Sequence, residues 1–213
     1  MFVGERMSQP VITVSPDTPV HDALVMFRKE HIRRAPVVKD GKMLGIVSES
    51  DLLNASPSPV TSLSVWEMNY LMSKVTVKNV MTKKVKTIDV NTPIEEAARI
   101  MADSKIGGMP VMRSGKMVGM ITETDLFKIF LELMGARTKA LRVTALVEEK
   151  PGQLAKVTKA IAEAGGDFLA FGMFAGPDTS SRIITFKVAR LKKDEVIQAL
   201  EKVVKKFWDI RQT

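Results

Sequence analysis

The chain has 213 residues, 45% of them hydrophobic and 26% charged, as in a soluble globular protein of one or two domains. It lacks cysteine, which excludes disulfides, thiolate metal sites and cysteine nucleophiles, and its apolar runs are shorter than the ~18 residues of a membrane span. The net charge is +8, of which residues 136–213 supply +6, with fifteen basic and nine acidic side chains.

The first part of the chain predicts a helix and a hairpin. The N-terminal residues form no apolar stretch of signal-peptide length, so a cytoplasmic location is expected. After an extended segment at residues 11–14, Thr18 and Pro19 predict a helix N-cap and first helical position. Apolar residues spaced for one helix face follow, to about Glu30. Two strands, 35–38 and 43–47, then flank a two-residue hairpin turn at Asp40 and Gly41.

The chain then repeats this pattern. Residues 81–127 align with residues 7–53 at a constant offset of 74 without a gap, and 16 of the 47 pairs are identical. The second copy therefore predicts the same elements, with Thr92 and Pro93 at the helix start and Ser114 and Gly115 at the hairpin turn. Each copy is expected to be a strand–helix–strand–strand–helix unit, and the two units are expected to pack face to face.

Between the copies, Pro57-Ser58-Pro59 interrupts the chain, and an apolar stripe predicts a helix, through Leu63, Trp66, Tyr70 and Leu71. Such a stripe is typical of a core or an interface, and stacking of Trp66 and Tyr70 on an adenine ring is the alternative.

The last third follows a different pattern. A strand at 141–147, a turn at 150–152 and a helix with Leu154, Val157, Ala160 and Ile161 on its buried side are expected first. Strands at 168–174 and 183–188, a helix at 194–207 and a last strand at 208–211 follow. This order, β-α-β-β-α-β, is the ferredoxin-like arrangement, so the fold class is α+β or α/β throughout.

Both copies carry a hydroxyl, two residues and an aspartate directly after a strand: Ser48 with Asp51, and Thr122 with Asp125. One interpretation is a capping box, in which hydroxyl and carboxylate satisfy free backbone N–H groups at a helix start. The other is a nucleotide site, because a carboxylate has two oxygens for the vicinal hydroxyls of a ribose, and the helix start would face phosphates. The two roles are compatible.

Taken together, the Thr87 strand, the Ile106-to-Val111 segment, Gly115, Gly119 and the Thr122-x-x-Asp125 motif resemble a tandem pair of CBS domains. The resemblance covers residues 7–134 and implies two clefts that bind adenosine-containing ligands. It implies ribose contacts from the two aspartates, contacts from the neighbouring hydroxyls, and an adenine frame from the main chain at 32–36 and 106–110. The implied nucleotide-binding residues are Thr13, Arg33, Arg34, Pro36, Ser48, Asp51, Thr87, Ile106, Met109, Pro110, Thr122 and Asp125.

The copies differ where phosphate would be held. The first has His31, Arg33 and Arg34, and the second has Lys105, Gly107 and Gly108 at the matching positions. Several cations can clamp a polyphosphate, and a solvated basic loop is the alternative. Unequal sites are therefore expected, with basic residues of one repeat within reach of the other's cleft.

Residues 140–213 resemble an ACT domain, a small regulatory fold that often binds amino acids. Residues 148–154 match its first loop and residues 164–168 its second, and the implied effector-binding residues are Gly152, Gln153, Leu154 and Asp167. Glu149 and Asp167 depart from the family's usual residues, so a purely dimerising role is the alternative. The expected domains are CBS repeats at 1–54 and 80–135, a linker helix at 55–79 and the ACT domain at 136–213, an order similar to the acetoin-utilisation regulatory proteins.

The sequence shows no catalytic constellation and no metal-ligand spacing, because neither His21 nor His31 has a candidate partner. The expected protein is a non-enzymatic, homodimeric sensor without a membrane span. Its expected regulatory ligand is an adenine nucleotide, and no cofactor is expected. An amino acid is the candidate second effector. The rivals are a polyanion-binding or nucleic-acid-binding protein that uses its basic last third, and an assembly module with vestigial clefts.

Overall fold

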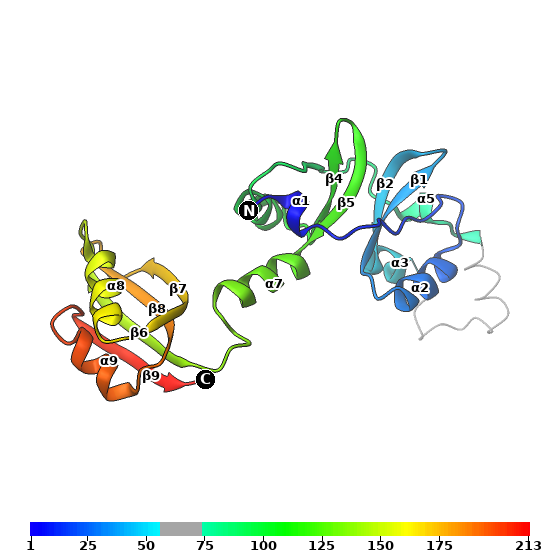
Figure 1. Ribbon diagram of the computed structural model, residues 1–213. Coiled ribbons are helices and arrows are strands. Elements are labelled where there is room, and N and C mark those ends of the chain that lie inside the picture. Colours follow the sequence, from blue (N-terminus) through cyan, green and yellow to red (C-terminus); the bar gives the residue numbers. More distant parts are fainter. Residues whose placement is uncertain (56–73) are drawn as a thin grey trace. The chain divides into compact units, whose positions relative to one another are not determined.

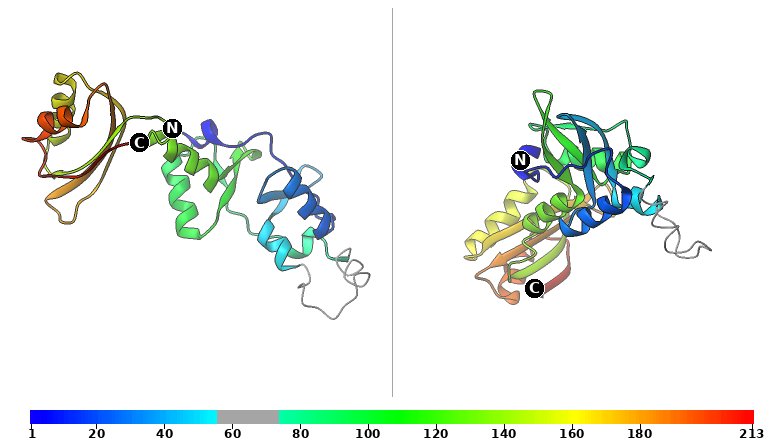
Figure 2. Two further views of the ribbon diagram at one scale, coloured as in Figure 1. Left: turned by 90° about the horizontal axis from the view of Figure 1, so that it is seen from below. Right: turned by 90° about the vertical axis from the view of Figure 1, so that its right-hand side faces the viewer.

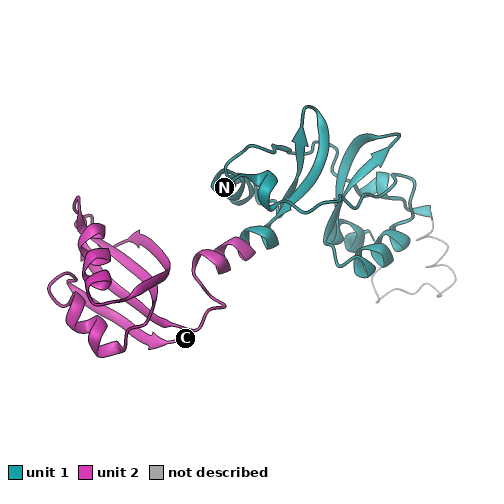
Figure 3. Cartoon of the chain, in the orientation of Figure 1, with its two compact units in different colours: residues 1–126 teal, residues 127–213 magenta. Residues whose placement is uncertain are grey.

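The computed structural model describes residues 1–55 and 74–213. It divides into two compact units, Met1–Leu126 and Phe127–Thr213, which are coloured separately in Figure 3. The boundary falls within helix α7 (Glu123–Leu133), earlier in the chain than the boundary expected between residues 135 and 136. The helix predicted to carry Leu63, Trp66, Tyr70 and Leu71 lies outside the described residues.

The first unit contains the two repeats, each a short sheet with helices packed on it (Figure 1). The first repeat has α2 (Val20–Lys29), β1 (Arg34–Lys39), β2 (Lys42–Ser48) and α3 (Glu49–Asn54). The second has β3 (Ile88–Asp89), α6 (Ile94–Ser104), β4 (Gly108–Arg113), β5 (Lys116–Thr122) and α7. The predicted unit is complete in the second repeat, where β3 runs parallel to β4. In the first, the leading strand is reduced to a single bridge between Val14 and Val37.

The two hairpins confirm the predicted turns. Asp40 and Gly41 have φ angles of 51° and 72°, and Ser114 and Gly115 have 49° and 76°. Positive φ at both central residues is the mark of a type I′ turn, whose twist matches that of the flanking strands. Both hairpins also shift register at the same place, between Val37 and Val38 and between Val111 and Met112.

Changing Ser114 to asparagine is expected to raise the free energy of unfolding by roughly 0.5 kcal/mol, because asparagine adopts positive φ more readily than serine. Gly115→Ala in the same turn is expected to lower it by about 1–2 kcal/mol, since a Cβ is strained there. Nothing lies within 4 Å of a Cβ built on Gly115, so the loss comes from the backbone alone. Urea denaturation measures both changes, and a stabilising Gly115→Ala would contradict the turn type.

The predicted starts of α2 and α6 are one residue too early. Pro19 and Pro93 are the N-caps, with ψ angles of 145° and 143°, rather than the first helical residues. Their carbonyl oxygens accept the first helical hydrogen bonds, from the N–H groups of Ala23 and Ala97. Thr18 does not cap α2, because its carbonyl oxygen accepts a bond from Val77 N–H instead.

The residues that precede each repeat pack on the other repeat. Val3, in α1 (Val3–Arg6), is fully buried in the core of the second repeat, and Val77, in α5 (Val77–Val80), is fully buried in the core of the first. The hydrogen bonds obey the same 74-residue offset: Val3 N–H donates to Thr92 and Val77 N–H donates to Thr18. The repeats therefore exchange their leading segments. The expected domains 1–54 and 80–135 each leave out a short helix that packs in the core of that repeat.

The second unit has the β-α-β-β-α-β order predicted from the sequence, and α8 and α9 lie on one face of its four-stranded sheet (Figures 1 and 2). Its elements are β6 (Leu141–Glu148), α8 (Gln153–Glu163), β7 (Asp167–Ala175), β8 (Ser181–Ala189), α9 (Lys193–Leu200) and β9 (Lys206–Gln212), with strand order β7-β8-β6-β9. The alternating buried residues of β6 and β8 meet Val157, Ile161, Val196 and Leu200 of the helices, forming one apolar core.

Two predictions for this unit are wrong. The helix expected over 194–207 ends at Leu200, because Lys205 N–H donates to the carbonyl of Leu146 at 2.7 Å and the chain turns into β9. Leu154, expected on the buried face of α8, is 42% exposed, and Gln153 is buried in its place. The side-chain amide of Gln153 donates to the carbonyl of Val203 at 2.7 Å, which satisfies the buried polar group.

Candidate functional site

The capping motif of the first repeat opens onto a pocket of about 490 Å³ within the first unit. The first repeat contributes Arg34, Ile46, Ser48, Ser50 and Asp51, and the second contributes Thr82, Lys84, Val85, Lys86, Ser104, Lys105, Ile106, Gly107 and Gly108. The second-repeat residues come from the chain before β3 and from the junction of α6 with β4. The pocket, called here the Asp51 pocket, therefore lies between the two repeats.

Asp51 is held by a capping box, as predicted. Its Oδ2 accepts hydrogen bonds from the N–H of Ser48 at 2.8 Å and from the hydroxyl of Ser48 at 2.6 Å. The hydroxyl oxygen in turn accepts a 3.2 Å bond from Asp51 N–H. Among the described residues no donor bonds to Oδ1. The cap thus orients the half-buried carboxylate and leaves one oxygen for a ligand.

The Asp51 pocket is rich in cations. Lys84, Lys86 and Lys105 of the second repeat line it together with Arg34 of the first. Lys86 Nζ donates to Ser104 Oγ at 2.6 Å. The sequence predicted Arg34 and a reach of basic residues across the repeats, but it missed Lys84, Lys86 and Ser104. A signal was present in the repeat alignment, which places Pro10 and Ile12 opposite the two lysines.

The side chain of Arg34 lies where Gly107 and Gly108 of the second repeat have no side chain. A Cβ built on Gly107 would lie 2.2 Å from Arg34 Nη2 and 2.8 Å from Glu123 Oε2, and one built on Gly108 would lie 3.0 Å from Arg34 Cδ. Partial burial lowers the pKa of the Arg34 guanidinium, against the opposite effect of the carboxylates of Glu123 and Asp51. The two glycines therefore admit a half-buried cation from the first repeat.

The second aspartate has a different environment. Asp125 is only 6% exposed, and its Oδ2 accepts bonds from Thr122 N–H at 2.9 Å and Thr122 Oγ1 at 2.7 Å. Ser8, from the exchanged N-terminal segment, lies 3.5 Å from Oδ1 and directs its hydroxyl toward it. Both aspartates accept bonds from the N–H and hydroxyl groups three residues earlier, but the carboxylate of Asp125 is buried and that of Asp51 lines a pocket.

Several predicted nucleotide-binding residues do not line the Asp51 pocket. Arg33 and Thr87 are exposed, Pro36 and Pro110 are buried in β1 and β4, and Met109 is fully buried in the core of the second repeat. Ile106 does line the pocket. The structure thus brings together Arg34, Ser48, Asp51 and Ile106 of the predicted set.

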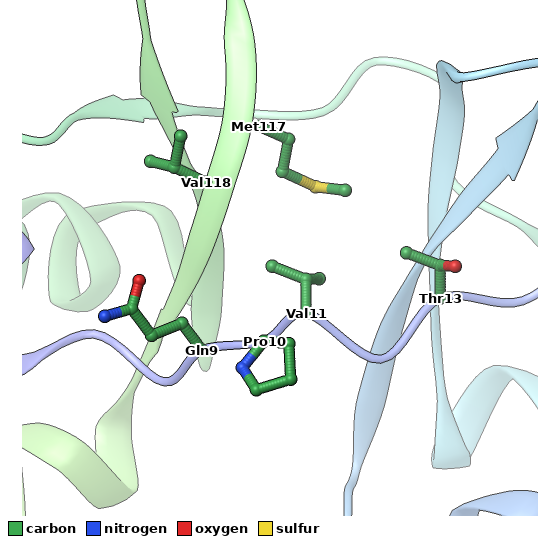
Figure 4. A pocket seen from close by; sticks show the side chains of 6 residues that line it. All are labelled: Gln9, Pro10, Val11, Thr13, Met117 and Val118. Atoms are coloured by element: carbon green, nitrogen blue, oxygen red, sulfur yellow. The ribbon is translucent and has the colours of Figure 1, made fainter.

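Thr13 lies in a second, more open hollow of about 610 Å³, shown in Figure 4. The described residues that line it carry no charge; they are Gln9, Pro10, Val11, Thr13, Met117 and Val118. The segment 9–13 here runs past β5 of the second repeat. Among the described residues that line it, only Gln9 and Thr13 have polar side chains, so this hollow has fewer groups to bind a nucleotide than the Asp51 pocket.

The predicted effector residues of the second unit lie apart from one another. Gly152, at φ 79°, precedes α8, whereas Asp167 opens β7 after α8 has ended. The eleven residues of α8 separate them by about 16 Å, at 1.5 Å a residue. Gln153 is engaged inside the unit, as described above. One copy of this unit therefore does not bring the four residues together.

The described residues show neither a metal-binding cluster nor a membrane-spanning helix. Among them no three His, Cys, Asp or Glu side chains are grouped so as to hold a metal ion. None of the helices at residues 1–55 and 74–213 is long and apolar enough to cross a membrane.

The chain resembles several known proteins. A CBS domain-containing protein of Dictyostelium discoideum is 30% identical over 136 residues, which are 63% of this chain and 94% of that protein. An inosine-5′-monophosphate dehydrogenase of Thermoplasma acidophilum is 32% identical over 117 residues, 54% of this chain but only 21% of the enzyme.

Solved structures share the fold of the part of the chain that they cover. A structure from Vibrio cholerae, proposed to be an acetoin utilization protein, matches with a TM-score of 0.53 and 28% identity. The match covers 64% of this chain and 95% of the other. A CBS domain pair in complex with 5′-methylthioadenosine and S-adenosyl-L-methionine matches with a TM-score of 0.51 and 26% identity, over 65% and 98% of the two chains. The family model for the CBS domain matches residues 3–58 and 77–132, more than half of the sequence. The chain therefore belongs to the CBS domain family and carries two CBS domains in tandem.

Proposed function

We propose that the protein is a non-enzymatic regulatory sensor that binds an adenine nucleotide, or a related adenosine-containing ligand, between its CBS domains. The observation that carries the proposal is the Asp51 pocket, where an oriented carboxylate of one repeat faces a wall made by the other. A ligand in this pocket touches both repeats. It shifts their packing to the extent that it binds one arrangement better than another.

The pocket has the parts that a nucleoside needs. Asp51 Oδ1 can accept a hydrogen bond from a ribose hydroxyl, and the hydroxyls of Ser48 and Ser50 lie beside it, 2.9 Å apart. Ile46, Val85 and Ile106 offer apolar surface to an adenine ring.

The relatives support an adenosine ligand. One similar CBS domain pair was crystallised with 5′-methylthioadenosine and S-adenosyl-L-methionine. Another similar structure, from Methanocaldococcus jannaschii, is 25% identical over 61% of this chain. That protein was proposed to be an archaeal homologue of γ-AMPK. By analogy, an adenosine compound is the first ligand to test on this protein.

For the second unit the proposal is an ACT domain that mediates dimerisation. Its β-α-β-β-α-β order supports the ACT assignment. The separation of Gly152 from Asp167 favours a dimerising role over an effector site within one copy. Strand β7 lies at the edge of the sheet and exposes Leu169, Met173 and Phe174 at 39%, 45% and 46%. Long apolar edge strands usually pair with another strand, so a second copy of the chain is the proposed partner.

The rival proposal, polyanion binding by the basic last third of the chain, has weaker support than the sensor proposal. Arg142 and Arg211 both pair with Asp209, and Lys187 is buried with its ammonium group bonded to the carbonyl of Thr138 at 2.8 Å. Basic side chains that are already paired or buried contribute little to an electrostatic surface for nucleic acid.

Thermal denaturation of the full chain with AMP, ADP, ATP, NAD and S-adenosylmethionine tests the sensor proposal. A ligand present at a hundred times its dissociation constant is expected to stabilise the protein by ~2.7 kcal/mol. For a chain of this size that is a rise in melting temperature of roughly 5–10 °C. The absence of a shift with every compound would contradict the proposal and favour an assembly or polyanion-binding role.

A further inference from the structure

The cations of the Asp51 pocket outnumber its acids. Arg34, Lys84, Lys86 and Lys105 line it, and Asp51 is its single carboxylate among the described lining residues. Within the part of the chain that the structure describes, none of the three lysines forms an ion pair, and Lys86 bonds only to a neutral hydroxyl. Even with Glu123, whose carboxylate acts on Arg34, the pocket holds more positive than negative charge.

The other repeat shows that this charge is not needed for the fold. The positions that match Lys84, Lys86 and Lys105 are Pro10, Ile12 and His31. At the last of these positions the backbone is the same in both repeats, since Lys105 and His31 have φ angles of 53° and 52°. Thr82 pairs with Ile46 as Ser8 pairs with Met120. The repeat therefore keeps the same bridge, and the same backbone at the Lys105 position, with other side chains in place of the lysines.

We propose that the Asp51 pocket takes an adenine nucleotide with two or three phosphates in preference to S-adenosylmethionine or an uncharged nucleoside. This inference rests on the proposed function and specifies its ligand. Asp51 of the first repeat holds the ribose, and lysines of the second repeat hold the phosphates, so the ligand ties the two repeats together. A diphosphate or triphosphate matches the excess of cations through charge-assisted hydrogen bonds, whereas a sulfonium group would add one more positive charge.

Isothermal titration of the full chain with ATP, ADP, AMP, 5′-methylthioadenosine and S-adenosylmethionine tests the inference. ATP and ADP are expected to bind at least about tenfold more tightly than 5′-methylthioadenosine, and S-adenosylmethionine is expected to bind most weakly. Their advantage is expected to shrink as salt is raised, because the lysines are exposed. Tighter binding of S-adenosylmethionine or 5′-methylthioadenosine than of ADP would overturn the inference and leave the adenosine proposal standing.

Variants separate the phosphate contacts from the rest of the site. The double variant Lys84→Ala, Lys86→Ala is expected to weaken ATP about tenfold or more and to leave 5′-methylthioadenosine unchanged. Lys105→Gly removes a cation at a position where glycine is free of strain, and His31→Gly is its matched control in the other repeat. Only Lys105→Gly is expected to weaken ATP. Equal losses for ATP and 5′-methylthioadenosine in the lysine variants would contradict the assignment.

Inorganic tripolyphosphate distinguishes a nucleotide site from a general anion site. It is expected to bind more weakly than ATP, and Asp51→Ala is expected to affect ATP but not tripolyphosphate. Tripolyphosphate that binds as tightly as ATP would assign the pocket to free polyphosphate and overturn the inference. If none of the adenosine compounds binds, the proposed function itself fails.

Discussion

Replacing Asp51 with alanine is expected to weaken adenine-nucleotide binding by about 10- to 100-fold, whereas Asp125→Ala should leave most of the binding intact. Asp51 Oδ1 is the ribose acceptor of the proposed site, and each hydrogen bond to a charged group contributes about 1.5–3 kcal/mol. Asp125 is buried, and both of its oxygens face hydroxyl groups of the protein. Isothermal titration with ATP or ADP measures the difference between the two variants.

Stability measurements keep the two roles of each aspartate apart. Asp51→Ala also removes a capping box, which is expected to lower the free energy of unfolding by about 0.5–2 kcal/mol without ligand. The ligand-induced shift, and not the melting temperature itself, is therefore the quantity to compare. Asp125→Ala is expected to cost more, since Asp125 is buried and its loss leaves the hydroxyls of both Thr122 and Ser8 without this acceptor. Normal nucleotide binding by Asp51→Ala would contradict the assigned site.

The parts predicted correctly are those that depend on local chemistry. Asp40-Gly41 and Ser114-Gly115 predict their turns because few residue pairs accept positive φ twice. Ser48 and Asp51 predict a capping box because the hydroxyl and the carboxylate are three residues apart, and the structure closes it at 2.6 Å. The same motif led to Asp51 as a candidate ligand residue, since a cap orients a carboxylate without consuming both of its oxygens.

The parts that were missed depend on contacts distant in sequence. The end of α9 at Leu200 is set by pairing with β6, which lies more than fifty residues earlier in the chain. The apolar pattern beyond Leu200 continues to favour a helix and carries no trace of that strand. The repeat alignment sets Lys84 and Lys86 apart from Pro10 and Ile12, but it does not show that the two lysines face Asp51 of the other repeat. The chemistry of a cleft between two repeats belongs to neither repeat alone.

The exchange of leading segments could not be predicted from the periodic pattern of the sequence. Val3 and Val77 lie 74 residues apart, the spacing of the repeat, but just before its aligned part. Each lies in a helix of four residues, too short for a periodic pattern to identify. Gly45/Gly119 and Met7/Met81 were visible as identical pairs, and the structure explains them together. Met7 lies against Gly119, and Met81 against Gly45, where the exchanged segments cross.

Changing Gly119 to alanine is accordingly expected to lower the free energy of unfolding of the first unit by about 1–3 kcal/mol. A Cβ at this position would lie 2.2 Å from Met7 Sδ, 2.8 Å from Met7 Cγ and 3.2 Å from Met7 Cβ. The backbone at Gly119 is not in the left-handed region, so alanine is otherwise tolerated and would usually stabilise by about 0.4–1 kcal/mol. The sign of the change, measured by urea denaturation, therefore reports on the packing of Met7.

A double-mutant cycle with Met7→Ala shows whether that contact is the cause. Because all three atoms near the new Cβ belong to the Met7 side chain, removing its sulfur and Cγ is expected to relieve most of the strain. The coupling energy between the two sites should then reach about 1 kcal/mol or more. Gly45→Ala offers a contrast, because its Cβ would lie 2.8 Å from the carbonyl oxygen of Thr82 as well as 2.9 Å from Met81 Sδ. Met81→Ala removes the sulfur but not the carbonyl, so it is expected to rescue Gly45→Ala only in part. Equal rescue at both crossings would show that the backbone of the exchanged segment moves freely, and that the two repeats are less firmly joined than their hydrogen bonds indicate.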